Sequence, residues 1–175
     1  RGDLNFRLFN DTVRLEANAY IKNLNPVFYY RHFHSKHYWW DNEDLSKIMR
    51  TRIEGQLSID RWRTRLKAGV ENITNYTYLD NASVGYTTGE GETATTSYKN
   101  NVAVRQHSGS IQVFSASLRQ DFKLGILHLD NEVTYQTSSN QDILPLPKLT
   151  LYHNLYLKFG LAKKVLSIEM GADIR

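Results

Sequence analysis

Apolar and polar residues alternate one by one along much of this chain. In the segment KLTLYHNLYLKF, residues 148–159, the odd positions are mostly leucine, with His153 and Phe159, and the even positions are Lys, Thr, Tyr or Asn. Successive side chains of a β-strand point to opposite faces, so a period of two predicts a strand with one apolar and one polar face. A helix would need a period near 3.6, which this segment lacks.

The same alternation recurs in seven other segments, which together predict an all-β chain. These segments are rich in Tyr, Thr, Ile and Val, and no Lys, Arg, Asp or Glu falls in their apolar register. In one of them Ile111 and Val113 fall out of phase, so either a β-bulge lies near 113 or the register there differs. The eight predicted strands are 4–8, 12–24, 49–60, 61–72, 110–122, 126–136, 148–159 and 165–175.

Strand length and loop order favour a membrane barrel over a soluble sheet. Most of the predicted strands have 11 to 13 residues, whereas soluble strands average about 5–6 and bilayer-spanning strands about 9–11. Short connections and long loops alternate, which puts every long loop at one end, as in outer-membrane barrels. The short connections lie near 9–12, 60–61, 123–126 and 160–164, and the long outer loops cover about 25–48, 73–109 and 137–147.

The hairpin at 49–72 allows a specific prediction of register. A two-residue turn at Asp60-Arg61 would place Ile59 opposite Trp62. On the polar face the same register pairs opposite charges across the strands, and such pairs contribute about 0.2–1 kcal/mol each. The predicted polar-face pairs are Glu54 with Lys67 and Arg50 with Glu71.

Composition limits the classes of protein to which the chain can belong. Its 175 residues suit one domain, and the net charge of +4 is too small, with acids and bases interleaved, to predict a nucleic-acid partner. There is no cysteine, and no run of eighteen apolar residues predicts a transmembrane helix. The mean hydropathy of −0.52 is compatible with a barrel, because only every second residue needs to be apolar.

Charged residues gather on the predicted polar faces and are the hypothetical lining of a pore. The basic group either favours anionic solutes or stiffens the wall through cross-strand ion pairs. An acidic group on later strands could set up a transverse field with it. The hypothetical pore-lining residues are Arg50, Arg52, Glu54, Arg61, Arg63, Arg65, Lys67, Asp130, Glu132, Glu169 and Asp173.

Aromatic residues crowd the segment 28–42, and Tyr and Trp favour a membrane–water boundary. The hypothetical interface aromatics are Tyr29, Tyr30, Tyr38, Trp39, Trp40 and Trp62. A sugar-stacking platform is the alternative. The spacing of His32, His34 and His37 fits no defined metal site. No nucleophile signature occurs, so the sequence predicts no catalytic, cofactor-binding or metal residues, no cofactor and no enzyme.

Several motifs resemble those of a known family. These are Pro26 followed by Ser35-Lys36-His37-Tyr38-Trp39-Trp40, then His128 to Asn131, Gln136 to Asn140, and Pro145 to Pro147. Together they resemble the Bacteroidetes "putative porin" family of outer-membrane β-barrels, although that family has Asn where Lys36 stands. The resemblance covers nearly the whole chain. It implies a passive pore, with these strands forming one arc of a longer barrel.

The sequence therefore predicts an antiparallel meander of about eight long amphipathic strands, an arc of a larger transmembrane β-barrel, with residues 1–175 as one segment of a longer chain. The expected function is passive diffusion of small hydrophilic solutes across a bacterial outer membrane. The expected partners are outer-membrane lipid and these solutes, and a homo-oligomer or an outer-membrane complex is left open. The alternatives are a soluble β-sandwich or lectin-like binding module and part of an active outer-membrane transporter.

Overall fold

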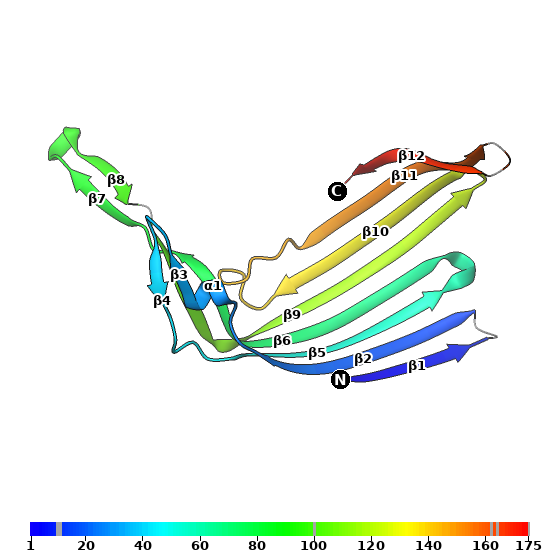
Figure 1. Ribbon diagram of the computed structural model, residues 1–175, viewed down its shortest axis with the longest axis horizontal. Helices are drawn as coiled ribbons and strands as arrows, with labels where there is room; N and C mark the ends of the chain where they lie inside the picture. The colour runs from blue at the N-terminus through cyan, green and yellow to red at the C-terminus, as the bar shows by residue number, and fades with distance from the viewer. Residues whose placement is uncertain (10–11, 100, 162, 164, 175) are drawn as a thin grey trace. The chain divides into compact units, whose positions relative to one another are not determined.

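The computed structural model of the chain is dominated by β-strands (Figure 1) and describes residues 1–9, 12–99, 101–161, 163 and 165–174. The elements, in chain order, are β1 (Gly2–Leu8), β2 (Val13–Leu24), α1 (Phe28–Arg31), β3 (His32–His34), β4 (Trp39–Asp41), β5 (Ile48–Ile59), the 3-10 helix η1 (Asp60–Trp62), β6 (Thr64–Asn81), β7 (Val84–Thr88), the 3-10 helix η2 (Gly91–Thr93), β8 (Thr95–Lys99), β9 (Val102–Leu124), β10 (Leu127–Ser138), β11 (Leu149–Leu161) and β12 (Leu166–Ile174).

Eight long strands form one antiparallel sheet in the order β1-β2-β5-β6-β9-β10-β11-β12. Each strand of this sheet therefore lies beside the strand of the same sheet that precedes it in the chain. The predicted all-β meander is confirmed. Within the described residues β1 and β12 are the two edges, so the sheet is open. Two small hairpins, β3-β4 and β7-β8, stand outside it. None of the helices in the described ranges is long and apolar enough to cross a membrane.

The chain divides into two compact units, and several long strands run through both. The first unit contains residues 1–21, 51–72 and 111–175, and the second contains 22–50 and 73–110. In the first unit β9, β10, β11 and β12 lie side by side (Figure 1). The β9–β10 turn there is tight: Leu124 is opposite Leu127, and Gly125 takes a positive φ of 60° that suits glycine.

The distribution of burial is the reverse of that in a soluble protein. Ile53 is 64% exposed while its neighbour Glu54 is 9% exposed, and Val70 is 50% exposed while Glu71 is 6% exposed. Soluble domains normally bury aliphatic side chains and leave carboxylates in water. The apolar face of this sheet is thus open, and the polar face holds the packed side chains.

The β5–β6 turn differs from the prediction. β5 ends at Ile59 and β6 begins at Thr64, so the connection has four residues, a 3-10 turn followed by Arg63 in the left-handed region (φ 52°). The predicted two-residue turn at Asp60-Arg61, and with it the pairing of Ile59 with Trp62 inside a strand, is wrong. Arg63 is neither glycine nor asparagine, the residues that usually take this conformation, so the turn type could not be predicted from the residue types.

The strands also extend into the predicted loop 73–109. β6 continues to Asn81 and β9 starts at Val102, and between them β7 and β8 form a hairpin in which Val84 is opposite Lys99. Gln106 anchors this region: its side chain donates to the Ser46 carbonyl (2.7 Å) and accepts from the Ser46 amide (2.9 Å). These side-chain to backbone hydrogen bonds join residues 60 positions apart in the chain, and they hold the loop in place without an apolar core.

No bulge is needed between 113 and 124. The pairing of β9 with β10 is continuous from Leu124 opposite Leu127 to Val113 opposite Ser138. Val113 therefore lies on the polar face, as does Ile111, which is completely buried there. The predicted register of Phe114, Leu118 and Phe122 on the apolar face is retained, and Ile111 and Val113 are apolar residues of the polar face. Parts of the predicted connections at 9–12 and 160–164, and the end of the last predicted strand at 175, lie outside the described residues.

A row of polar side chains crosses the apolar face. Gln120 on β9 is opposite Asn131 on β10, which is opposite His153 on β11. The His153 Nδ1 atom lies 2.7 Å from Asn131 Oδ1, and Asn131 Nδ2 donates to the Gln120 carbonyl (3.1 Å). Gln120 in turn donates to the Trp62 carbonyl (2.7 Å). The row therefore satisfies its own polar groups on a face that is otherwise apolar.

The Asn131–His153 contact predicts a measurable coupling. Asn131→Ala removes the acceptor of His153, and we expect the intact protein to lose about 1–3 kcal/mol in its free energy of unfolding. The double variant Asn131→Leu with His153→Leu removes both polar partners and should recover most of that loss. Urea unfolding of the reconstituted protein measures both. A double variant that loses more free energy of unfolding than Asn131→Ala alone would show that the two side chains do not stabilise each other.

Candidate functional site: the polar face of the sheet

Buried charge on the polar face is concentrated around Glu54 in β5. Lys67 Nζ on β6 lies 2.9 Å from Glu54 Oε1, and Arg52 forms a short ion pair with the other Glu54 oxygen. Arg52 also reaches Glu71 on β6 at 3.5 Å. The predicted ion pair between Glu54 and Lys67 is present, but the predicted register is not, because Gly69 and not Lys67 lies next to Glu54 on β6. For Glu71, which was paired with Arg50 in the predicted register, the structure gives an ion pair with Arg52.

The neighbouring strand β2 extends this network. Asn18 Nδ2 donates to Glu54 (3.3 Å), and Gln56 Nε2 donates to Glu16 (3.0 Å). Polar side chains of three adjacent strands thus hold one another in place. Because Glu54 is nearly enclosed yet accepts from two cations and an amide, its charge is compensated where it lies.

Near the β5–β6 turn, which is at the end of the sheet with the short connections, the polar face contains a hollow of about 310 Å³. Its lining residues are Ser58, Ile59, Asp60, Arg63, Thr64, Arg65, Arg119 and Asp121. Both carboxylates are already paired: Asp60 with Arg14 of β2 at 2.7 Å, and Asp121 with Arg119 at 3.1 Å. In the described part of the chain no carboxylate lies within ion-pair distance of Arg63 or Arg65. Within the described ranges the hollow therefore has two guanidinium groups without a carboxylate partner.

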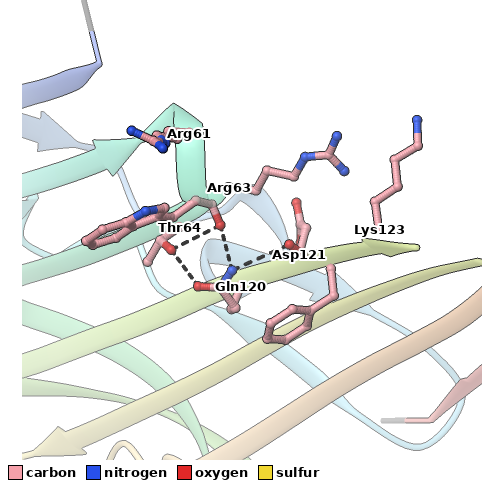
Figure 2. Close-up of a pocket in the computed structure, with 8 residues that line it drawn as sticks. Arg61, Arg63, Thr64, Gln120, Asp121 and Lys123 are labelled. Atoms are coloured by element: carbon pink, nitrogen blue, oxygen red, sulfur yellow. Dashed lines mark hydrogen bonds between the residues drawn. The ribbon is translucent and has the colours of Figure 1, made fainter. Parts of the chain in front are cut away.

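A second hollow adjoins it between the β5–β6 turn and β9 (Figure 2). It measures about 610 Å³ and is lined by Arg61, Trp62, Arg63, Thr64, Gln120, Asp121, Phe122 and Lys123. Figure 2 shows the Arg63, Asp121 and Lys123 side chains extending to the same side. Backbone pairing holds this arrangement, since the Asp121 amide donates to the Arg63 carbonyl at 3.2 Å.

A third hollow, of about 350 Å³, is acidic. Its lining includes Asp130, Glu169 and Asp173, and the ladder aligns Asp130 with Asn154 and Asn154 with Asp173 across β10, β11 and β12. Lys158 forms an ion pair with Glu169 at the edge of this group. Acidic and basic hollows thus lie in the same unit on the same face.

The structure brings together only part of the predicted pore-lining set. Arg52, Glu54 and Lys67 are in contact, whereas Arg61 and Arg63 lie in the turn and not on a strand. The other predicted residues lie on strands, namely Arg50 on β5, Arg65 on β6, Asp130 and Glu132 on β10, and Glu169 and Asp173 on β12. Five partners were left out of the set although their alternation placed them on the polar face, namely Asn18, Glu71, Arg119, Asp121 and Lys158.

The aromatic segment forms a small hairpin in the second unit. Trp40 stacks on Phe33 with ring centroids 4.9 Å apart, and its indole donates to the Tyr29 carbonyl (2.9 Å). Trp39 is 73% exposed. The remaining predicted interface aromatics lie in α1 (Tyr29, Tyr30), before β4 (Tyr38) and, in the first unit, in the β5–β6 turn (Trp62).

Asp41 is the polar centre of that hairpin. It accepts hydrogen bonds from the Trp39 indole (3.0 Å) and faces His32 Nδ1 (3.0 Å) and His34 Nε2 (2.8 Å). These contacts, the Trp39 bond first, hold the pKa of the Asp41 carboxyl well below its usual value. Among the described residues no group of three or more His, Cys, Asp or Glu could hold a metal ion.

A long-stranded antiparallel meander with an exposed apolar face and an ion-paired polar face defines the class of membrane β-barrel walls. The family comparison agrees: the family model described as "Putative porin" matches residues 1–175, and the chain belongs to this family. The family description implies a porin-like, non-enzymatic role and an outer-membrane location. The searches of curated proteins and of solved structures find no match.

The Glu54 network predicts an unequal response to two similar substitutions. Glu54→Gln removes the charge that compensates Arg52 and Lys67, and we expect a loss of about 1–3 kcal/mol in the free energy of unfolding. The matched control, Glu169→Gln, breaks the exposed pair with Lys158 and should cost less than about 1 kcal/mol. Urea unfolding of the intact protein, followed by tryptophan fluorescence, compares them. Equal losses would mean that the Glu54 pairs contribute no more than surface pairs.

The Asp41 hairpin predicts a dependence on pH. A carboxyl whose folded pKa is lowered stabilises the folded state above its unfolded pKa, and this contribution is lost as pH falls toward the folded value. The hairpin should therefore be closed at neutral pH and loosen progressively below about pH 4. The fluorescence of Trp39 reports this change. Asp41→Asn should abolish the transition and the control Asp44→Asn should retain it; an acid transition unchanged in Asp41→Asn would assign it to another group.

Proposed function

We propose that this chain forms part of the wall of an outer-membrane β-barrel through which small hydrophilic solutes diffuse passively. The observation that carries the proposal is the reversed burial of neighbouring side chains, with Ile53 and Val70 exposed on one face and Glu54 and Glu71 enclosed on the other. A wall with lipid on one side and an aqueous lumen on the other needs this arrangement.

Closure of the barrel follows from backbone hydrogen bonding. In hydrocarbon an unpaired amide or carbonyl costs several kcal/mol, so an open edge is not tolerated there. The two edge strands, β1 and β12, therefore require further strands as partners in the membrane. We propose that these eight strands are an arc of a larger barrel.

The width of the lumen follows from the side chains that fill it. In a barrel of about eight strands the interior is just wide enough for side chains to fill. Here the polar face carries long charged side chains and two hollows, of about 350 and 310 Å³. A wider, hydrated lumen accommodates them, and water in that lumen is the path for hydrophilic solutes.

The soluble alternative needs a partner for the apolar face. A β-sandwich packs a second sheet about 10 Å from the first and buries both inner faces. In the described ranges this face remains open, with Leu151 and Leu155 each more than 40% exposed. Lipid is the partner that fits a face of this kind, and it requires no further protein layer.

Single-channel recording of the intact protein in a planar bilayer tests the proposal. We expect stable steps in which current is proportional to voltage, because a passive water-filled pore has no gating cycle. Heat-modifiable mobility on gels verifies that the protein in the same preparation is folded. Folded, inserted protein without any conductance would overturn the diffusion pore and favour a plugged transporter barrel.

A further inference from the structure

Among the described residues, two arginines of the polar face lie without a carboxylate partner near the β5–β6 turn, beside cations that do have one. Lys67, Arg52, Arg119 and Arg14 each have a carboxylate partner within 4 Å. In the hollow next to them Arg63 and Arg65 have none among the described residues, although Asp60 and Asp121 line the same hollow. Those two carboxylates are held by other arginines, so their charge does not cancel that of Arg63 and Arg65.

We propose that Arg63 and Arg65, with Lys123 on the same side as Arg63, form a binding subsite for the oxyanion group of a solute, a phosphate or a carboxylate. The guanidinium group presents paired N–H donors in a plane that matches two oxygens of such a group. The 310 Å³ hollow has room for the group itself, and the adjoining 610 Å³ hollow brings in Lys123. This inference rests on the proposed pore and specifies the class of solute that it favours.

The four-residue turn creates the subsite. The left-handed conformation of Arg63 takes it out of the strand alternation, so that it lines both hollows, and Figure 2 shows it extending to the same side as Lys123. In a two-residue turn Arg63 would be a regular strand residue. The bond from the Asp121 amide to the Arg63 carbonyl (3.2 Å) ties the turn to β9.

Binding of inorganic phosphate to the intact protein tests the subsite independently of transport. We expect broadening of the phosphorus resonance of inorganic phosphate by folded protein in a maltoside detergent. Arg63→Gln with Arg65→Gln should weaken binding by about tenfold, because the ion-paired hydrogen bonds of two guanidinium groups are lost. The charge-matched control, Lys36→Gln with Lys99→Gln, changes exposed lysines elsewhere and should bind as the wild type does. Equal broadening by the double arginine variant would overturn the proposal.

A conservative variant separates recognition by the paired N–H donors of arginine from attraction by positive charge alone. Arg63→Lys with Arg65→Lys keeps both charges but loses the planar pairs of donors. It should keep the anion preference of the pore, measured as reversal potential in a salt gradient, and bind phosphate about threefold or more weakly than wild type. Succinate in place of phosphate shows whether carboxylates compete for the same residues. Phosphate binding in this variant equal to that of wild type would overturn the bidentate subsite.

Bilayer recordings distinguish failure of this inference from failure of the pore. Conductance whose anion preference falls about threefold or more in Arg63→Gln with Arg65→Gln supports the subsite. Conductance with an unchanged preference overturns the subsite as a selectivity element and leaves the pore intact. Absence of conductance in folded, inserted protein overturns the pore, and the phosphate titration then decides the subsite alone.

Discussion

Backbone hydrogen bonding between consecutive strands is the interaction on which the rest of this structure depends. Apart from Pro26, only two apolar side chains among the described residues are buried, Ile73 and Ile111, so no aliphatic core holds the sheet together. The ladder supplies the missing order: twelve consecutive residue pairs join β9 to β10 and nine join β10 to β11. A sheet that relies on its ladder can expose an entire apolar face, provided that the surroundings are apolar too.

The register of this backbone hydrogen bonding also determines which charged side chains come into contact. Once β5 and β6 are in register, Glu54 has Lys67 within 2.9 Å and Arg52 has Glu71 within 3.5 Å. The side chains on this face are therefore not a collection of independent charges. Most of them compensate one another and stiffen the wall, which is what cross-strand pairs do in a sheet. Among the described residues only a small part of the charge on this face lacks a partner of opposite sign.

The sequence predicts the sheet well because alternation is a local signal. Each of the eight segments shows its own two-residue period, and the chain order of strands follows from the short connections between them. The signal fails where both faces are polar: after Ile73, the residues Asn75 and Thr77 show no alternation of apolar and polar positions, so β6 was predicted to stop nine residues before Asn81. It fails again at Ile111, where an apolar side chain is buried on the polar face.

The candidate site depends on a detail that alternation cannot supply. Alternation groups Arg61, Arg63, Arg65 and Lys67 as equivalent positions of one strand. The four-residue turn makes them different, because Arg61 and Arg63 leave the strand and Lys67 is within reach of Glu54. Arg65 stays on the strand but next to carboxylates that other arginines already hold. Whether a basic residue of this sheet has a carboxylate partner thus follows from the geometry of a single turn.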